Sequence, residues 1–221
     1  MFGLFIPQIT QAQGTTYVSN LSDPSTGSSP VGSDSWFAAD FITGTNASGY
    51  VLNSVQLAMM DASGSPSGFR VMLYSDVIFG CGDIPGNSLG TLSGSTDPST
   101  ANTYTYTDDS DTTLSPNTVY YIVLTAGTAV ANGPYEWSVT STPSPGYSSY
   151  HWGGEVAFLH SSNGSSWNNI DGTYGQFALT ATAIPEPGVS GLLGLSGLGF
   201  LWHRRKAKAV YGLALTFICS L

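Results

Sequence analysis

Three side chains in one short stretch have the chemistry to bind a metal ion or to move a proton. His151, Glu155 and His160 lie close together in HWGGEVAFLH, and imidazole and carboxylate groups are common zinc ligands and acid–base catalysts. Their spacing does not match the His-Glu-x-x-His pattern, and Gly153 and Gly154 argue against the helix that this pattern requires. We therefore expect strand residues here and predict no metal centre.

The densest acidic stretch, Asp108-Asp109-Ser110-Asp111, offers oxygen ligands of the kind that calcium prefers. It lacks the glycine and the terminal glutamate of an EF-hand loop, so a solvated hairpin turn is the preferred interpretation and calcium the alternative.

The sequence contains no nucleophile elbow, phosphate-binding loop or dinucleotide fingerprint. No pair of carboxylates stands out as the acid and base of a glycoside hydrolase. We predict a non-enzymatic protein with no cofactor.

Aromatic residues in Ser- and Gly-rich stretches suggest a binding surface instead. Flat rings exposed on the loops of a β fold suit the apolar C–H faces of sugars, whereas burial in the core is the alternative for any tryptophan. A platform for carbohydrate such as exopolysaccharide is therefore a candidate site, formed by Trp137, Tyr150, Trp152 and Trp167.

Charge is distributed unevenly along the chain. Arg70 is the single Lys or Arg before the cluster of Arg204, Arg205, Lys206 and Lys208, whereas 13 of the 14 acidic residues precede Pro185. The region before Pro185 is therefore negatively charged. A negative surface repels the phosphate backbone of nucleic acids, which argues against nucleic-acid partners. With Cys81 and Cys219 as its two cysteines, the region before residue 184 cannot form an internal disulfide and must rely on packing.

The elements that would position these side chains are short strands. Only 9% of residues are charged, and Gly, Ser, Thr and aromatic residues are abundant, which favours strands and turns over helices. Alternating patterns separated by turn-rich stretches predict an antiparallel β-sandwich or jelly roll. The expected strands are Thr15–Asn20, Trp36–Ile42, Tyr50–Met60, Phe69–Tyr74, Thr103–Thr107, Val119–Ala126, Tyr135–Thr140 and Gln176–Ala183.

Two local features of these strands can be predicted. In Tyr50–Met60, strict alternation places Val51 on the same face as Val55, Leu57 and Met59. In TLSPNTVYYIVLTAG, a turn precedes Tyr120, which is similar to a tyrosine corner, where the hydroxyl bonds back to the upstream turn. Ordinary packing of Tyr120 on a sheet is the alternative.

The two ends of the chain differ from its middle. Residues 1–12 resemble the remnant of a secretory signal peptide, with a buried first strand as the alternative. Gly188 to Trp202 is an uncharged run of 15 residues, about 22 Å long as a helix and short of the roughly 30 Å hydrocarbon core. The basic cluster after it would stay cytoplasmic and leave the large N-terminal region outside.

Ile184-Pro185-Glu186-Pro187, the Gly/Leu-rich span and His203-Arg204-Arg205-Lys206 together resemble the PEP-CTERM sorting signal of Gram-negative bacteria. The resemblance implies transient anchoring in the inner membrane and recognition by an exosortase, which would cut near Pro185, Glu186 and Pro187. Such signals normally end after the basic residues, whereas AVYGLALTFICSL follows here.

The stretches GSSPVGSDSWFAADFITG and YVLNSVQLAMMDASGSPSGFRVMLYSD are similar to choice-of-anchor domains of type R, which implies an exported, surface-associated β domain. We therefore expect a signal remnant (1–12), a β-sandwich domain (13–183), a sorting signal (184–208) and an atypical apolar tail (209–221). The predicted function is a non-enzymatic cell-surface or extracellular matrix protein. A carbohydrate-binding module is the alternative, and a glycoside hydrolase is less favoured.

Overall fold

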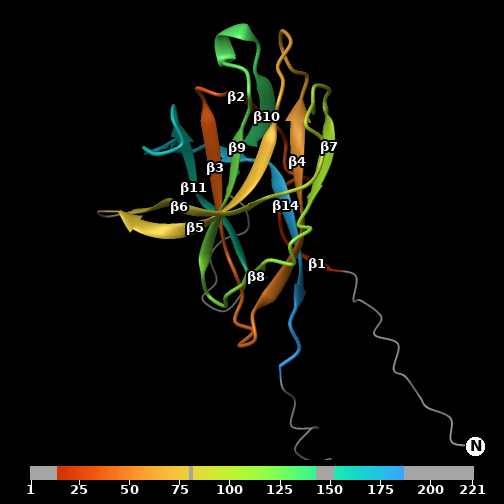
Figure 1. Cartoon of the computed structure of the whole chain (residues 1–221), viewed down its shortest axis with the longest axis vertical. Coiled ribbons are helices and arrows are strands. Elements are labelled where there is room, and N and C mark those ends of the chain that lie inside the picture. The colour runs from red at the N-terminus through yellow and green to blue at the C-terminus, as the bar shows by residue number, and fades with distance from the viewer. Residues whose placement is uncertain (1–13, 80–81, 143–151, 187–221) are drawn as a thin grey trace, which may run out of the picture. The chain divides into compact units, whose positions relative to one another are not determined.

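A computed structural model describes residues 14–79, 82–142 and 152–186 of the chain. These residues form fourteen β-strands and one turn of 3-10 helix, Val130–Asn132, and the strands pair in two antiparallel sheets (Figure 1). The prediction of an all-β fold with two packed sheets is confirmed. Among the described residues no helix has the length and apolar character needed to cross a membrane.

The first sheet has eight strands and is built around the long strand β4. One edge of β4 pairs with β14 and, at its end, with β10, while the other edge pairs with β8 and β7. Its strands are β1 (Thr15–Ser19), β2 (Gly27–Val31), β4 (Tyr50–Met60), β7 (Asn102–Thr107), β8 (Thr113–Leu114), β10 (Tyr135–Thr140), β13 (Tyr174–Gly175) and β14 (Phe177–Ala183).

The second sheet has six strands in the order β12-β11-β3-β9-β5-β6. Its members are β3 (Trp36–Ile42), β5 (Arg70–Phe79), β6 (Gly82–Thr91), β9 (Val119–Thr125), β11 (Gly153–Ser161) and β12 (Asn168–Asn169). The expected strands at 36–42, 50–60 and 135–140 have the predicted bounds. Strand β6 was not predicted, because its sequence GDIPGNSLGT has the composition of a loop.

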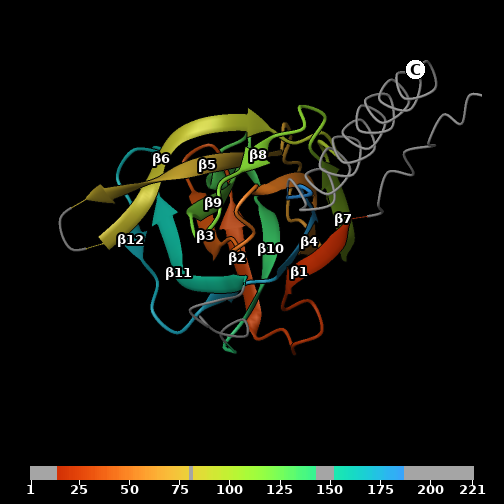
Figure 2. The same cartoon turned by 90° about the horizontal axis from the view of Figure 1, so that it is seen from below.

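The main hydrophobic core lies between the two sheets, which face each other in Figure 2. Leu57, Trp137 and Leu179 enter it from the eight-stranded sheet, and Phe41 and Ile122 enter it from the six-stranded sheet. All five side chains are at most 1% exposed. The alternation of apolar residues along these strands therefore specifies which face of each sheet points inward.

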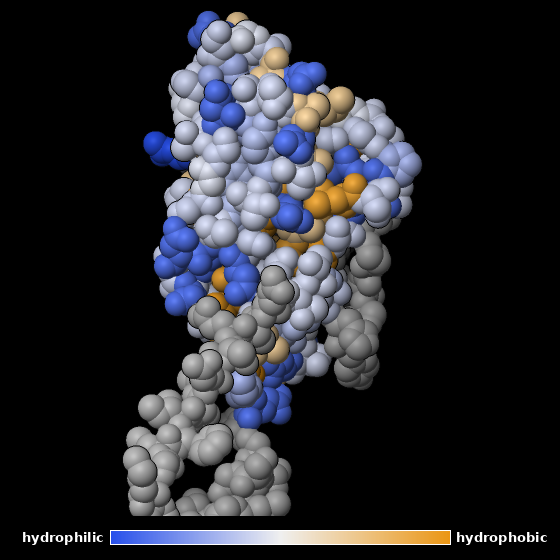
Figure 3. Space-filling model, turned by 90° about the vertical axis from the view of Figure 1, so that its right-hand side faces the viewer, coloured by the Kyte–Doolittle hydropathy of each residue, from blue (hydrophilic) through white to orange (hydrophobic). Residues whose placement is uncertain are grey.

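A second, smaller apolar cluster covers the outer face of the six-stranded sheet. Strand β9 contributes to both clusters, since Tyr120 and Ile122 face the main core while Tyr121 and Val123 belong to the second cluster. The outer face of the eight-stranded sheet is different. That side of the molecule is mostly pale to blue in Figure 3, with an orange patch and a few separate apolar spots.

The prediction that Val51 shares a face with Val55, Leu57 and Met59 is wrong. Strand β4 carries an irregularity where its pairing with β14 shifts between Ser54 and Leu52, and a bulge of this kind places an extra residue in one strand. The side-chain faces exchange at Asn53, so Leu52 is buried together with Val55 and Val51 is only partly buried. Strict alternation along the sequence cannot anticipate this insertion.

The predicted tyrosine corner is confirmed. The hydroxyl oxygen of Tyr120 accepts a hydrogen bond from the backbone N–H of Ser115 at 2.9 Å. Asn117, between them, has a backbone φ of 49°, in the left-handed region that asparagine adopts more readily than most residues. The hydroxyl thus holds the turn that leads into β9.

The compact unit that contains the β-sandwich extends to Ile184. Its last backbone hydrogen bond runs from the N–H of Ile184 to the carbonyl of Gly49 at 3.0 Å, and the side-chain amide of Asn46 donates to the Ile184 carbonyl at 2.9 Å. The expected signal remnant, the membrane segment at 188–202 and the tail at 209–221 lie outside the described residues.

Candidate functional site

The outer face of the six-stranded sheet contains a hollow of about 340 Å³, within the range of roughly 300–1,000 Å³ that is usual for small-molecule sites. We call it the outer hollow. Its floor comes from the central strands β3 and β9, and its walls come from strands at the two opposite edges of the sheet, β6 and β12. It is lined by Asp40, Asp83, Ile84, Tyr121, Ala157, Leu159, Trp167 and Asn169.

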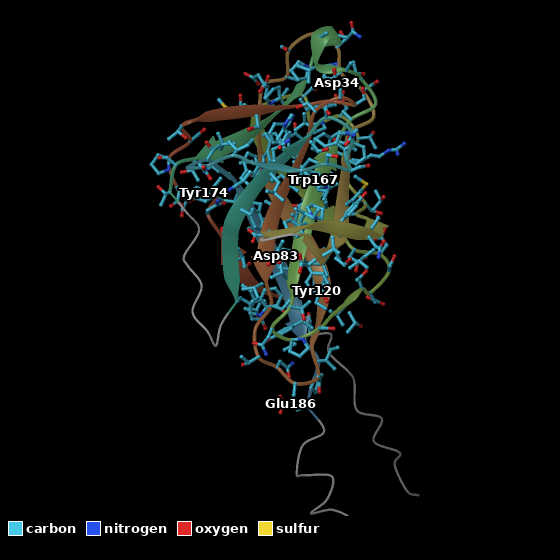
Figure 4. The ribbon with its side chains drawn as sticks, turned by 90° about the vertical axis from the view of Figure 1, so that its left-hand side faces the viewer. Asp34, Asp83, Tyr120, Trp167, Tyr174 and Glu186 are labelled. Atoms are coloured by element: carbon cyan, nitrogen blue, oxygen red, sulfur yellow. The ribbon has the colours of Figure 1, made fainter. Side chains whose placement is uncertain are left out.

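The hollow exists because the six-stranded sheet curls until its two edges approach the same region. The pairing of β5 with β6 shifts on both sides of Tyr74, and the pairing of β11 with β3 shifts between Gly154 and Phe158. Such irregularities bend strands and increase their twist. Figure 4 shows the outcome, with Asp83 of the β6 edge and Trp167 beside the β12 edge on the same face.

Two side-chain donors at the hollow have no partner within the described part of the chain. They are the hydroxyl of Tyr121, whose side chain is fully buried, and the indole N–H of Trp167. A buried polar group without a hydrogen bond costs about 1–3 kcal/mol, so such groups are rare in folded proteins and require an explanation. Both residues line the hollow, where a bound molecule can supply the missing hydrogen bonds.

Three carboxylates act electrostatically on the Tyr121 hydroxyl. They belong to Asp40, Asp76 and Asp83, and their negative charge adds to the effect of burial in raising the pKa of Tyr121 well above its ordinary value. The hydroxyl therefore keeps its proton under physiological conditions and is able to donate it in a hydrogen bond. Asp40 is 8% exposed and accepts the Ala157 N–H at 2.9 Å.

The pKa of Asp76 is raised as well. Burial of its carboxyl group is the larger cause and the negative charge of Asp83 the smaller, while a backbone hydrogen bond from Val77 acts in the opposite direction. One carboxylate oxygen of Asp76 has no hydrogen-bond partner within the described residues. The outer hollow therefore combines a negative electrostatic field with unpaired hydrogen-bond donors.

A second hollow, of about 380 Å³, lies beside Arg70 between β5 and the loop after β6. Tyr106 lines this second hollow. Its hydroxyl already has a hydrogen-bond partner, because it donates to the Ser95 carbonyl at 3.1 Å. Burial raises the pKa of Tyr106, so it stays protonated in this bond. This hollow thus lacks the unpaired groups that distinguish the outer hollow.

The four predicted platform residues do not form one surface. Trp137 is 0% exposed in the main core and donates to the Gln176 carbonyl at 3.0 Å, so it is unavailable to a ligand. Trp152 packs against the main core, where it stacks on Tyr17 with ring centroids 4.5 Å apart. Trp167 lines the outer hollow, and Tyr150 lies outside the described residues.

Asp108 of the predicted acidic stretch and His160 of the predicted histidine cluster make structural contacts. Asp108 accepts the backbone N–H groups of Ser110 and Thr112 at 3.1 and 2.6 Å. The segment is a turn, but not the expected hairpin, because β7 before it and β8 after it both pair with β4 and not with each other. The imidazole Nε2 of His160 lies 3.3 Å from the Ser35 hydroxyl, and its ring contacts Phe37. His151 and the side chain of Glu155 lie outside the described part.

The segment with the clearest relation to known proteins begins at the last residue of β14. Residues 183–206 match the PEP-CTERM protein-sorting motif. The motif marks an exported protein that is transiently anchored in a membrane and sorted by an exosortase. Pro185 and Glu186 are exposed, whereas Pro187 and the cluster of Arg204, Arg205, Lys206 and Lys208 lie outside the described residues. A comparison with curated proteins found no match.

Asp40 and Tyr121 were not predicted as site residues. The available signal was Asp40 itself, a charged residue within the otherwise apolar strand WFAADFI. Alternation places it on the face opposite to Phe37 and Phe41, and pairing places it opposite Tyr121. The contribution of Asp83 from β6 could not be anticipated, because it depends on the curl of the sheet.

Proposed function

We propose that this protein is a non-enzymatic component of the cell surface or extracellular matrix, displayed after exosortase processing. The observation that carries the proposal is the junction between fold and motif. Strand β14 ends at Ala183, Ile184 makes the last backbone bond of the unit, and Pro185 follows directly. A cut near Pro185-Glu186-Pro187 would therefore leave every strand of the sandwich in place.

The proposal also assigns roles to the segment after the β domain and a family to the β domain itself. Residues 188–202 would form the temporary membrane segment, and the basic residues 204–208 would hold its end on the cytoplasmic side of a Gram-negative inner membrane. The β domain would be a choice-of-anchor domain of type R. The fit between a self-contained sandwich and an adjacent sorting motif supports this organisation.

A non-enzymatic role is supported by the use of polar side chains within the described region. Asp108 caps a turn and His160 contacts a serine and an aromatic ring, so both have a part in the fold. Display on a surface requires a stable scaffold and an exposed face, which a two-layer sandwich provides.

The test compares the wild-type protein with a Glu186→Ala, Pro187→Ala variant in a native host, using intact mass and membrane fractionation. We expect a wild-type species that ends near Ala183 and is lost in the variant, together with accumulation of the unprocessed variant in the inner membrane. A matched Asp171→Ala variant, altered in a loop before β14, is expected to be processed normally. Chains of full length in all three strains would contradict the proposal.

A second candidate function, carbohydrate binding, is favoured by the outer hollow, where an aromatic side chain lies beside unpaired donors and carboxylates. A glycoside hydrolase is less favoured, because Asp40 already accepts a backbone N–H and is engaged in holding β11.

A further inference from the structure

We propose that the outer hollow binds a neutral or amino sugar unit of a polysaccharide, with Trp167, Tyr121, Asp40 and Asp83 as the recognition residues. This inference deepens the second candidate function, and it replaces the platform expected from the sequence with a single site. The chain places these four side chains together from β3, β9, the β6 edge and the loop before β12.

The hydrogen-bonding groups of the hollow are complementary to sugar hydroxyls. Each sugar hydroxyl can donate and accept, and the hollow has both kinds of group. The Tyr121 hydroxyl and the Trp167 N–H are buried donors without a partner among the described residues, while the carboxylates of Asp40 and Asp83 are acceptors. Asp40 accepts the Ala157 N–H and has a further interaction within the protein, and a carboxylate has about four lone-pair sites.

The apolar part of the hollow suits the C–H face of a sugar ring. Trp167 is half-buried and packs against the second apolar cluster, and Ile84 and Ala157 border the same space. An indole that is held by packing on one part and exposed on another presents a flat apolar surface at low entropic cost. The hollow therefore resembles a small-molecule site, mostly apolar with a few polar groups that set orientation.

Charge narrows the class of sugar. Asp40, Asp76 and Asp83 act together on Tyr121, and their field disfavours a uronate or sulfated residue in the same space. Neutral hexoses and protonated amino sugars are compatible with it. A bare divalent cation fits less well, since no three Asp, Glu, His or Cys side chains converge as a ligand set among residues 14–79, 82–142 and 152–186.

The test titrates the full chain, in a zwitterionic detergent that carries no sugar, with oligosaccharides of glucose, glucosamine, N-acetylglucosamine and uronic acid. Calorimetry and tryptophan fluorescence report binding. We expect saturable binding of at least one neutral or amino oligosaccharide and none of the uronic acid oligomer. Trp167→Ala and Tyr121→Phe are each expected to weaken binding at least about tenfold, equivalent to about 1.4 kcal/mol.

Two matched control variants separate a loss of binding at the outer hollow from a general loss of stability. Trp36→Ala removes a tryptophan that packs against the same outer cluster but does not line the hollow, and Tyr120→Phe removes the neighbouring hydroxyl on the inner face. Both controls are expected to retain binding, and Tyr121→Phe is expected to keep the thermal stability of wild type.

Absence of saturable binding across the panel, preference for the uronic acid oligomer, or binding that survives both Trp167→Ala and Tyr121→Phe would overturn the proposal. None of these results would affect exosortase sorting, which is measured separately by processing at residues 185–187. Cleavage of an oligosaccharide that is lost with Trp167→Ala would support the site while contradicting the non-enzymatic function.

Discussion

Tyr120 and Tyr121 are adjacent in β9 and have opposite surroundings. The Tyr120 hydroxyl is paired with Ser115 inside the corner, whereas the Tyr121 hydroxyl is buried and unpaired within the described part of the chain. Loss of a paired hydroxyl costs stability, while loss of an unpaired one can be neutral or stabilising. We therefore expect the Tyr120 hydroxyl to have a structural role and the neighbouring Tyr121 hydroxyl to have a binding role.

Replacement of Asp76 by asparagine is expected to stabilise the protein at neutral pH. Burial and the charge of Asp83 raise the pKa of Asp76 above 3.8, so the folded state binds this proton more tightly than the unfolded chain. The free energy of unfolding then falls as pH rises from 3.8 to the folded pKa, and the full cost persists above that window. Urea unfolding of wild type and Asp76→Asn across pH 3 to 8 measures the difference, which should shrink on acidification.

Asp83→Asn serves as the partner in a double-mutant cycle for this prediction. Without the Asp83 charge, part of the repulsion that raises the pKa of Asp76 is removed, and the gain from Asp76→Asn should be smaller. Asp40 and Tyr121 face the same region and stay unchanged in all four proteins. A stability difference that is independent of pH would show that the Asp76 carboxylate is not strained by its surroundings.

At the scale of elements, a buried polar network ties the end of β1 to β10 and β14. The Gln176 side chain accepts the Ser138 hydroxyl at 2.6 Å and donates to the Asp23 carbonyl at 2.7 Å. Asn20 accepts the Phe177 N–H at 2.8 Å and donates to the Gly175 carbonyl at 2.9 Å. These bonds fix the loop that enters β14 relative to two other strands.

Gln176→Leu is expected to destabilise the protein by roughly 1–3 kcal/mol for each group left without a partner. The matched control is Gln56→Leu in β4, where the side chain donates to Thr105 at 3.3 Å in an exposed position and a change within about 0.5 kcal/mol is expected. Denaturant midpoints of the two variants measure the contrast. Equal effects of both substitutions would mean that the network adds nothing beyond surface hydrogen bonding.

Elements with strong alternation could be predicted from the sequence, and those shaped by tertiary contacts could not. Trp36–Ile42 and Tyr135–Thr140 were predicted with the observed bounds because apolar residues alternate through them. Val51 was misplaced by a bulge. Strand β6 is held by its partner β5 along seven residue pairs despite its Pro and Gly content, and propensity is a weak guide where pairing decides.

The candidate site could be predicted only in part for the same reason. Trp167 is a candidate from the sequence because it is an aromatic residue in a Ser- and Gly-rich stretch, and it lines the hollow. Trp137 was selected by the same criteria and lies in the core, because the alternation of β10 turns it inward. Composition identifies side chains that can bind sugar, whereas the curl of the sheet decides which of them share a surface.

At the scale of the whole molecule, the fold and the sorting motif share only Ala183 and Ile184. Strand β14 pairs with β1 on one edge and β4 on the other, up to the pair Ala183↔Tyr50. Ile184 adds its bonds to Gly49 and Asn46. Pro185 cannot donate a further backbone hydrogen bond, so strand pairing and signal are separated at this residue.

A chain shortened to end at Ile184 is therefore expected to unfold at the same denaturant midpoint as the full-length chain. A chain that ends at Ala178 should fail to fold, because it loses Leu179 and Ala181 from the main core and leaves the edges of β1 and β4 unpaired. Circular dichroism and urea unfolding of both truncated proteins test this expectation. If the chain ending at Ile184 were clearly less stable than the full-length chain, residues beyond Ile184 would contribute to the fold, and cleavage in the motif could not release an intact domain.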